Sequence, residues 1–466
     1  MFKEIILECA KKTCGTSKIL NNRKQTVWWN EEIKQQVQSK KRKWKVYLTK
    51  KTEESLEEYK RQRNIVKSTI AAAKEKAWSE FGTKMEENYK SNQKLFYKVL
   101  KTMRKGKKIE NTAVKNAHGQ ILTDEVEIMQ RWKEYFQELL VGEEINDRQE
   151  ETNSNEINAR ENEVITMEEM TQALRKLKNG KAPGQDKITS EMLKNMGGNG
   201  MEILLEILNK TWNEETIPTD WEMGLILPIF KKGDQKDCNN YRGIMLLSTG
   251  MKLYEQILNT RVKNIIEMTM TESQSGFRKG RSTQDHIFTI QQIINKTRLK
   301  RGNAYMAFID LEKAFDKVPR AKVWDILEKK GVNNKLNKVI QSLYRNTTNI
   351  VIYKNMKSAI FKTKEGLRQG GGMSPTLFTV FMDHIIKKCN ERTKTLFVGY
   401  RNLQAVNISE CAYADDVVIM AASEKELQKN IDMWKEVLGE NGMKINVKKT
   451  KTMAITEEQQ KINIQI

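Results

Sequence analysis

The longest regular pattern of apolar and polar positions runs from Thr52 to Phe81. This stretch holds no Gly or Pro, and its apolar residues recur at steps of three, four or seven. That spacing predicts a helix with one apolar stripe. The stripe consists of Leu56, Tyr59, Val66, Ile70, Ala73, Ala77 and Phe81. Tryptophans at helical spacing favour a place in the core over stacking on nucleic-acid bases, and we expect this of Trp28, Trp29, Trp44 and Trp78.

Two short apolar runs carry aspartates where a buried strand would make them costly. The run Tyr305–Leu311 contains Asp310 near its end and is followed by the helix-like EKAFDKVP, which predicts a strand ending on Asp310 and then a helix. In the second run, two apolar tetrads flank Asp415 and Asp416. This pattern predicts a tight hairpin with both acids at its tip.

Clustered carboxylates repel one another, and an unpaired buried charge is expensive. A divalent metal would neutralise them, and Mg²⁺ prefers such hard oxygen ligands. Three aspartates from two strand ends can hold two ions about 4 Å apart, which suits an in-line phosphoryl displacement. An ordinary solvated acidic turn is the alternative that this pattern alone leaves open.

Charge divides the 466 residues into blocks. Of the net charge of +22, residues 1–110 carry 29 Lys and Arg against 13 Asp and Glu, whereas residues 111–165 carry 5 against 13. The remainder is again basic, at 48 against 34. Such a charge indicates a polyanionic partner, although a single lysine run can equally be a solvated helix face. The acidic stretch that begins at residue 141 has no apolar period and predicts a linker, with a boundary near residue 158.

Several classes of function are disfavoured by what the chain contains. Five scattered cysteines without a CxxC pair argue against zinc and disulfides, and three histidines in no HExxH spacing leave catalysis to carboxylates and lysines. No apolar run reaches the roughly 18 residues of a membrane helix, so no membrane contact is expected.

Seven blocks in fixed order carry a more specific signal. YADD at 413–416 resembles the signature of reverse transcriptases, and FIDLEKAFD at 308–316 resembles their first catalytic aspartate strand. The other five blocks follow the order of LINE-like, non-LTR retrotransposon reverse transcriptases. They are NGKAPGQDKI from 179, LPIFKKGDQKDCNNYRGIMLLS from 227, SQSGFRKGRST from 273, GLRQGGGMSPTLF from 366 and GMKINVKKTKTM from 442.

This resemblance implies an α+β fold, a right-hand polymerase with palm and fingers. Residues 1–157 would form a basic helical extension that ends in the acidic linker, and residues 158–466 the reverse transcriptase domain. Fingers are expected at about 158–300 and palm at about 301–466. The thumb, which follows the last block in this family, is expected to be largely missing, as are an endonuclease and a zinc knuckle, so the chain resembles a fragment of a longer polyprotein.

The resemblance also implies the reaction and its metals. Asp310 and Asp415 would be the principal ligands of two Mg²⁺ ions, with the carbonyl of Leu311 helping and Asp416 completing the triad; Mn²⁺ is a possible substitute. A primer 3′-hydroxyl attacks the α-phosphate of a deoxynucleotide and releases pyrophosphate. The implied partners are an RNA template, a DNA primer and dNTPs, with an intracellular location in nucleus and cytoplasm as a ribonucleoprotein. Oligomeric state is left open.

The resemblance also implies nucleotide contacts at individual residues of this chain. Lys231 and Arg242 match positions that grip the triphosphate. Phe315 matches the bulky residue that excludes a 2′-hydroxyl, unless its ring is plain core. Gln369 and Gly370 match a nucleotide and template contact.

Three basic residues carry over as well. Lys449 matches a lysine proposed to protonate the leaving pyrophosphate, with Lys448 as the neighbouring alternative. Arg278 and Arg281 match a template-contacting block, and a charged loop is the alternative for both.

The chain departs from the family at residues 371–373, where Gly-Gly-Met replaces the usual Cys-Pro-Leu. Extra backbone freedom there is expected to weaken activity rather than the fold. Three alternative functions stay open for this sequence. They are a nucleic-acid-binding remnant that does not polymerise, an N-terminal bundle that binds protein, and an intron-encoded maturase.

Overall fold

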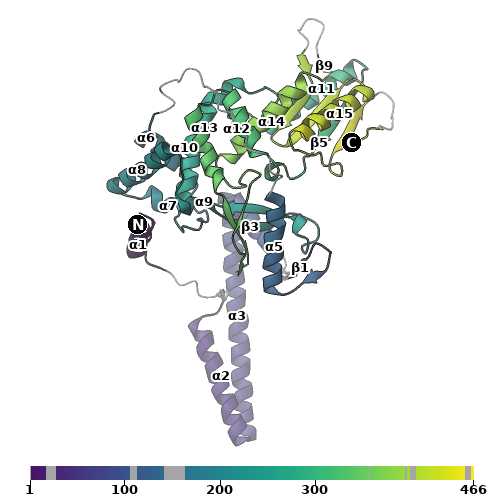
Figure 1. Cartoon of the computed structure of the whole chain (residues 1–466). Coiled ribbons are helices and arrows are strands. Elements are labelled where there is room, and N and C mark those ends of the chain that lie inside the picture. Colours follow the sequence, from purple (N-terminus) through teal and green to yellow (C-terminus); the bar gives the residue numbers. More distant parts are fainter. Residues whose placement is uncertain are drawn as a thin grey trace. The chain divides into compact units, whose positions relative to one another are not determined.

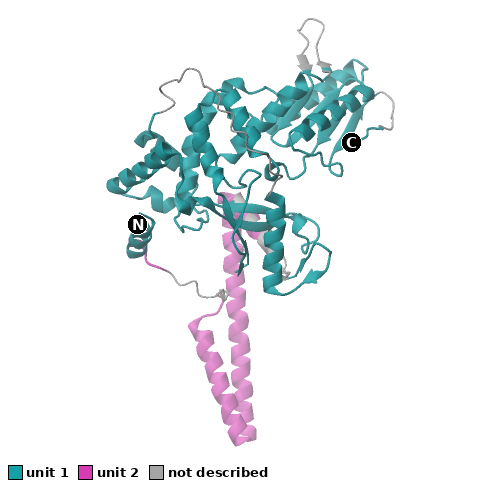
Figure 2. Cartoon of the chain, in the orientation of Figure 1, with its two compact units in different colours: residues 1–13, 112–466 teal, residues 14–111 magenta. Residues whose placement is uncertain are grey.

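The structure is a computed structural model, which describes residues 2–16, 28–104, 113–140, 163–354, 356–393, 396–398, 406–456 and 463–466 (Figure 1). These residues form two compact units, one of residues 1–13 with 112–466 and one of residues 14–111 (Figure 2). The boundary that we predicted near residue 158 therefore differs from the division between the units. Most of the acidic linker, residues 141–162, lies outside the described residues.

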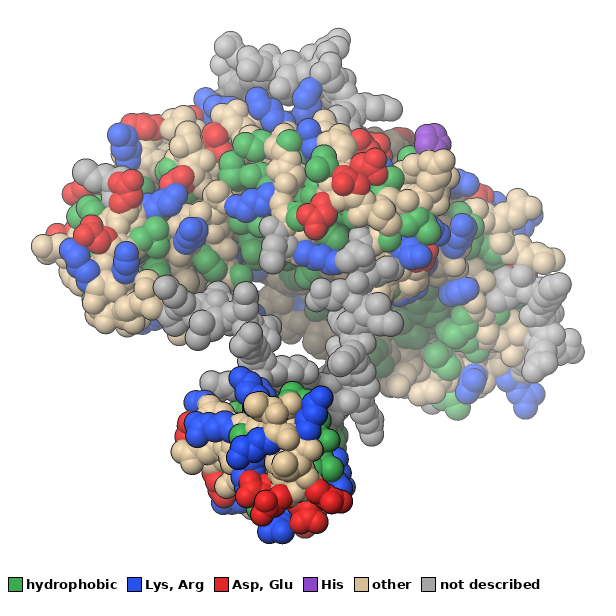
Figure 3. Space-filling view, turned by 90° about the horizontal axis from the view of Figure 1, so that it is seen from below, with side chains coloured by type: hydrophobic (Ala, Val, Ile, Leu, Met, Phe, Trp, Pro, Cys, Tyr) green, Lys and Arg blue, Asp and Glu red, His purple; other side chains and the backbone are tan. Residues whose placement is uncertain are grey.

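Residues 14–111, here called unit 2, are helical as predicted. The helices are α2 (Glu31–Lys50), α3 (Glu53–Ser91) and α4 (Gln93–Arg104). Thr52 caps α3 by accepting from the Ser55 amide, so the predicted helix begins where its pattern begins and runs ten residues further. At the end where α2 meets α3, Lys and Arg side chains share the surface with a group of Asp and Glu (Figure 3).

The tryptophans of unit 2 do not lie where we expected. Ile33 and Val66 are buried, but Trp29, Trp44 and Trp78 are exposed over 46%, 40% and 67% of their surface. Trp44 packs across α2 and α3 against Tyr59, with ring centroids 4.7 Å apart. The prediction of a core position for these three residues was wrong, because the lysine-rich faces leave too little apolar surface to cover an indole.

In the larger unit, here called unit 1, one sheet has five strands. They are β3 (Met223–Phe230), β4 (Tyr241–Leu246), β6 (Thr348–Tyr353), β7 (Met356–Lys357) and β8 (Phe361–Lys362). β3 pairs antiparallel with β4 and parallel with β6. A strand from beyond residue 301 thus completes a sheet whose first strands come from the expected fingers region, so the contiguous division at residue 300 does not describe this sheet.

Helix α5 (Glu125–Leu140) packs against the same sheet. This packing explains why the unit boundary lies near residue 112. Its Trp132 is fully buried, and the indole lies 5.0 Å from the Tyr241 ring and 5.3 Å from the Tyr353 ring. The short strands β1 (Val114–Lys115) and β2 (Ile121–Leu122) form a hairpin just before α5.

A second, wholly antiparallel sheet has the order β11-β12-β5-β13. Its strands are β11 (Glu410–Tyr413), β12 (Asp416–Ala421), β5 (Ala304–Ile309) and β13 (Lys451–Ile455). Helix α15 (Glu424–Glu440) packs on β12 and β5, next to α14 (Ser374–Asn390), and α11 (Thr283–Leu299) contacts β13 (Figure 1). Ile293 of α11 closes a separate apolar cluster with Met306 and Met420 of the sheet.

The other helices of unit 1 contribute residues to the main hydrophobic core, in which α10 (Thr249–Ile266) also lies. They are α1 (Phe2–Cys14), α6 (Met167–Lys176), α7 (Ser190–Lys194), α8 (Gly198–Glu214), α9 (Thr219–Glu222), α12 (Arg320–Lys329) and α13 (Asn334–Arg345), with short 3₁₀ turns η2 (Cys238–Asn240), η3 (Glu267–Thr269) and η4 (Ala314–Asp316) and the paired strands β9 (Leu396–Val398) and β10 (Val406–Ile408). In the described part of the chain, no helix has the length and apolarity needed to cross a bilayer.

Candidate active site

The Asp-Asp pair lies at a tight hairpin, as the sequence predicts. Tyr413 of β11 pairs with Asp416 of β12, which leaves a two-residue turn of Ala414 and Asp415. Ala414 has φ of +59°, the left-handed region that a side chain disfavours. Hairpin turns of two residues need such an angle at their first position and usually place Gly there.

Asp310 follows β5, the strand next to β12. Ile309 pairs with Val417, so the end of β5 lies beside the hairpin tip. The backbone of Asp310 is fixed from the other side, where its carbonyl accepts from the Asn446 amide at 2.8 Å. The predicted helix after Asp310 is largely absent, because this segment forms turns with only the 3₁₀ helix η4 and α12 begins at Arg320.

Lys449, rather than its neighbour Lys448, reaches the aspartates. Its Nζ donates to Asp310 Oδ2 at 2.6 Å. The pKa of Asp416 is raised, first by burial and then by the charges of Asp415 and Asp310, and Lys449 opposes this shift. The three carboxylates therefore share one region of negative potential that an ammonium group partly neutralises.

A cavity of about 650 Å³ opens beside these groups. Nine of the twelve residues that we singled out line it: Asp310, Leu311, Asp415, Lys231, Arg242, Phe315, Gln369, Gly370 and Lys449. Among the predicted site residues, Asp416, Arg278 and Arg281 are outside its lining.

Lys231 and Arg242 supply positive charge to the cavity from the ends of β3 and β4. The Lys231 amide donates to the Asn240 carbonyl at 2.8 Å, which fixes the start of the connecting loop. The pKa of Lys231 is lowered, first by burial and then by Arg242 and Lys449, while Asp310 opposes this. Three mutually repelling cations at one cavity favour the binding of a polyanion.

Phe315 lines the cavity and also packs on the core. Its ring stacks on Phe378 with centroids 4.3 Å apart, and its carbonyl accepts from the Leu367 amide at 2.8 Å. Phe315 is therefore a residue of the cavity lining whose ring is supported by Phe378.

The glycine turn is more constrained than we expected. Gly370 has φ of +123°, and a Cβ there would lie 2.4 Å from the Met245 carbonyl oxygen. The Met245 amide in turn donates to the Gln369 carbonyl at 2.7 Å, which ties the turn to β4.

A buried carboxylate holds the rest of the turn. Glu255 of α10 is fully buried, and its Oε2 accepts from the Gly372 amide at 2.6 Å. Burial raises the pKa of Glu255, whereas Arg368 and the amides of Gly372 and Met373 oppose this. The bond from the Gly372 amide to Glu255 holds the turn despite its glycines. Nothing in the sequence pattern distinguishes Glu255 from other glutamates in helices.

Asp316 is a second residue that sequence reasoning missed. It lines the cavity, and its Oδ1 accepts from Gln369 Nε2 at 3.2 Å. Burial raises the pKa of Asp316 to about 6, against the charges of Lys313, Lys317 and Arg242. Its place in FIDLEKAFD is the only sequence signal that points to it.

Arg278 and Arg281 are not among the residues that line the cavity. Arg278 is nearly buried, and its guanidinium is bound to Glu267 and to the carbonyls of Thr271 and Gln274. Arg281 forms an ion pair with the exposed Glu272. The role that the resemblance implied for Arg278 on template phosphates disagrees with this geometry, since its donors are already bound within the protein.

The donor set at the hairpin fits a hard divalent cation. Asp310, Leu311 and Asp415 line one cavity, and burial together with the charges of Asp415 and Asp310 raises the pKa of Asp416. Among the residues that the structure describes, no three His, Cys, Asp or Glu side chains already stand together as a ligand set. Lys449 Nζ binds Asp310 Oδ2, so a metal ion at that oxygen would compete with this ion pair.

These features are those of a nucleotide polymerase site, and the sequence comparisons agree. The model of the family "Reverse transcriptase (RNA-dependent DNA polymerase)" matches residues 229–464, about half of the chain. The chain belongs to the reverse transcriptase family.

Its relatives are proteins of retrotransposable elements. The chain is 24% identical over 288 residues to the Transposon TX1 uncharacterized 149 kDa protein of Xenopus laevis, which covers 61% of the chain and 22% of that protein. It is 28% identical over 270 residues to the probable RNA-directed DNA polymerase from transposon BS of Drosophila melanogaster, covering 56% and 28%. A third relative, the RNA-directed DNA polymerase from mobile element jockey of the same fly, is 23% identical over 295 residues, covering 61% and 31%. The resemblance to non-LTR elements is confirmed, and the chain spans less than a third of each of these relatives.

One solved structure is similar over 56% of each chain, that of apo telomerase from Candida Tropicalis truncated from its C-terminal domain, with 14% identity and a TM-score of 0.39.

Proposed function

We propose that this chain is the polymerase core of a non-LTR retrotransposon and acts as an RNA-directed DNA polymerase. The observation that carries the proposal is the convergence of Asp310 and Asp415 with Lys231, Arg242 and Lys449 on one cavity. Carboxylates for divalent ions beside cations for a triphosphate are the two requirements of nucleotidyl transfer.

In this proposal the antiparallel sheet β11-β12-β5-β13 is the palm, and the sheet that contains β3 and β4 is the base of the fingers. Lys231 and Arg242 then bind the triphosphate of the incoming dNTP from the fingers side. In the same proposal the ring of Phe315, which stacks on Phe378, excludes a sugar 2′-hydroxyl.

The reaction forms a bond between the primer 3′-oxygen and the α-phosphorus and breaks the bond to the bridging oxygen of pyrophosphate, while the hydroxyl proton passes to solvent water. Mg²⁺, held by Asp310, Asp415, Asp416 and the Leu311 carbonyl, supplies neutralisation of the phosphate charge when it is bound. Lys449 lies at the same cavity, where its ammonium group would donate a proton to the leaving pyrophosphate once it no longer binds Asp310.

Primer extension on an RNA template tests the proposal. Wild-type chain is expected to extend a DNA primer, and Asp415→Ala is expected to lose at least about 1,000-fold of the rate. Salt-dependent RNA binding without extension would instead identify a nucleic-acid-binding remnant.

A further inference from the structure

Residues 271–278 lie along the edge of β11 that faces away from β12. Gln274 pairs in parallel with Ala412. The Ser275 amide donates to the Ala412 carbonyl at 2.9 Å, and the Ala412 amide donates to the Ser273 carbonyl at 2.9 Å. This segment therefore adds a short extra strand to the hairpin that carries Asp415, and we call it the 271–278 strap.

Gln274 of the strap binds the tip of the hairpin. Its side chain is fully buried, its Oε1 accepts from the Ala414 amide at 3.0 Å, and its Nε2 contacts the Ala414 carbonyl at 3.4 Å. The same Oε1 accepts from the Gly276 amide at 2.8 Å. The side-chain carboxamide of Gln274 thus binds both the backbone N–H and the carbonyl of Ala414, the residue that directly precedes Asp415.

Ala414 is the residue of the turn that most needs to be held. Its φ of +59° is unfavourable for a residue with a side chain, and such a conformation persists only where the surroundings enforce it. The strap approaches it closely, because a Cβ on Gly276 would lie 2.3 Å from the Ala414 amide nitrogen. Only glycine allows this approach.

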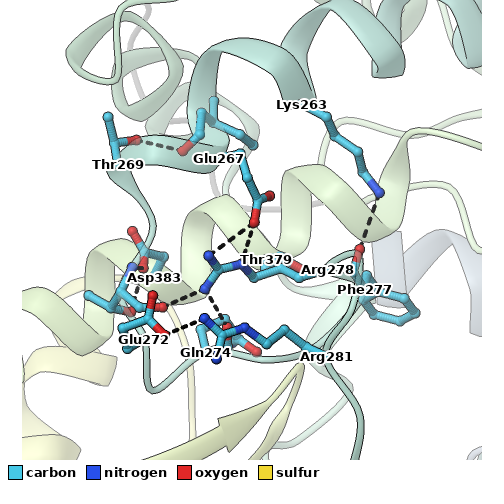
Figure 4. Close-up of polar contacts among 12 residues, drawn as sticks. Lys263, Glu267, Thr269, Glu272, Gln274, Phe277, Arg278, Arg281, Thr379 and Asp383 are labelled. Carbon is cyan, nitrogen blue, oxygen red and sulfur yellow. Dashed lines mark hydrogen bonds and ion pairs between the residues drawn. The ribbon is translucent and has the colours of Figure 1, made fainter.

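The strap is itself anchored (Figure 4). Arg278 donates to the carbonyls of Thr271 at 2.6 Å and Gln274 at 2.9 Å. The amide and hydroxyl of Thr271 both donate to the buried Asp383 on α14, at 2.7 Å and 2.6 Å. These bonds connect the position of Gln274 to a core helix.

We propose that Gln274 is a positioning residue for the polymerase site: it holds Ala414 in the left-handed conformation and so directs Asp415 into the cavity beside Asp310. Arg278 supports the strap from behind. The kinetic consequence rests on the proposed function, whereas the effect on the hairpin backbone does not.

Amide hydrogen exchange of the whole chain tests the backbone effect. Gln274→Met keeps the side chain's length and removes its hydrogen bonds, and we expect exchange in peptides covering residues 411–418 to rise at least about tenfold. The matched control is Asn337→Ala, which removes another buried amide, bonded to the Trp324 carbonyl at 3.1 Å. Unchanged exchange at 411–418 in Gln274→Met, or an equal rise in the control, would overturn the proposal.

Kinetics and rescue provide a second readout. In primer extension, Gln274→Met should lower kcat about tenfold or more and leave the KM for dNTP within about twofold, because the triphosphate contacts are intact. Adding Ala414→Gly should recover most of the loss, since glycine adopts this angle freely. A double variant no faster than Gln274→Met contradicts the assigned role of Ala414.

The role of Gln274 can still be tested if the wild-type chain is inactive or if Gln274→Met does not fold. If wild-type chain fails to extend a primer, the proposed function fails, and hydrogen exchange still decides the role of Gln274. If Gln274→Met does not fold, Arg278→Lys replaces it, because a single ammonium cannot span Glu267 and both strap carbonyls. Its expected rise in exchange at 411–418 is smaller but in the same direction, and no rise would overturn the proposal.

Discussion

At the scale of single residues, the ion pair between Lys449 and Asp310 has two opposing effects. The amine compensates a carboxylate that stands near two others, yet it occupies the oxygen that a divalent ion needs. In the proposed function, binding of the ion would compete with this ion pair, and the freed ammonium group of Lys449 would protonate the leaving group.

Replacing Lys449 by Gln should separate these effects. We expect kcat to fall about tenfold through loss of the proton donor, while the Mg²⁺ concentration for half-maximal rate falls, because no ammonium competes for Asp310. Magnesium titrations of primer extension measure both quantities, with Lys448→Gln as the control. A raised Mg²⁺ requirement in Lys449→Gln would contradict this account.

Lys231 predicts a pH dependence. Its pKa is lowered by burial and by Arg242 and Lys449, so its charge is complete below that pKa and is lost as pH rises through it. The KM for dNTP should therefore rise in alkaline solution at a lower pH than an ordinary lysine would allow. Lys231→Arg keeps its charge and should flatten the profile; parallel profiles for the two proteins would refute the assignment.

The residues of the candidate site were predictable from sequence only where a motif marks them. Asp310, Asp415 and Lys449 stand in recognisable blocks, and the structure brings them together. Glu255 and Gln274 act through backbone contacts with segments more than a hundred positions away, and such contacts leave no local pattern. Arg278 is the opposite case. Its motif predicted a contact with template phosphates, but its guanidinium donates to the Thr271 carbonyl within the protein.

At the scale of elements, the glycine turn after Gln369 is a fixed structure. Two of its glycines differ in a testable way. A Cβ at Gly370 would meet the Met245 carbonyl at 2.4 Å on a backbone with φ of +123°, whereas the nearest atom to a Cβ at Gly372 is Glu255 Oε2 at 3.6 Å.

Gly370→Ala should therefore lower extension at least about tenfold and destabilise the fold by about 1–3 kcal/mol, through strain and displacement of β4. Gly372→Ala keeps the amide that Glu255 binds and should stay within about twofold of wild type. Thermal unfolding and extension rates of the two variants provide the comparison. Equal losses in both would mean that the turn is not held as described.

Elements with local periodicity were predictable. The Asp-Asp hairpin and the helix from residue 53 follow from patterns within single stretches. The parallel pairing of β3 with β6 joins strands more than a hundred residues apart. The helix expected after Asp310 gave way to turns because the backbones of Glu312 and Phe315 are bonded to Lys444 and Leu367. Long-range pairing overrides the local preference there.

At the scale of the whole molecule, the two compact units divide the chain differently from its charge. The charge pattern placed a boundary near residue 158, but α5 packs its Trp132 on Tyr241 and Tyr353 and so belongs with unit 1. Helix α1 contributes Ile6 to the same core. Composition could not show this, because the buried face of α5 is a minority of its residues.

The central claim is that Asp310 and Asp415 catalyse DNA synthesis on an RNA template. The most direct measurement is the single-turnover rate of dNTP addition by wild type, Asp310→Asn and Asp415→Asn, with Asp325→Asn on the exposed face of α12 as the matched control. We predict a loss of at least about 1,000-fold in the first two variants and a rate within about twofold of wild type in the third. Equal rates in all four proteins would contradict the account.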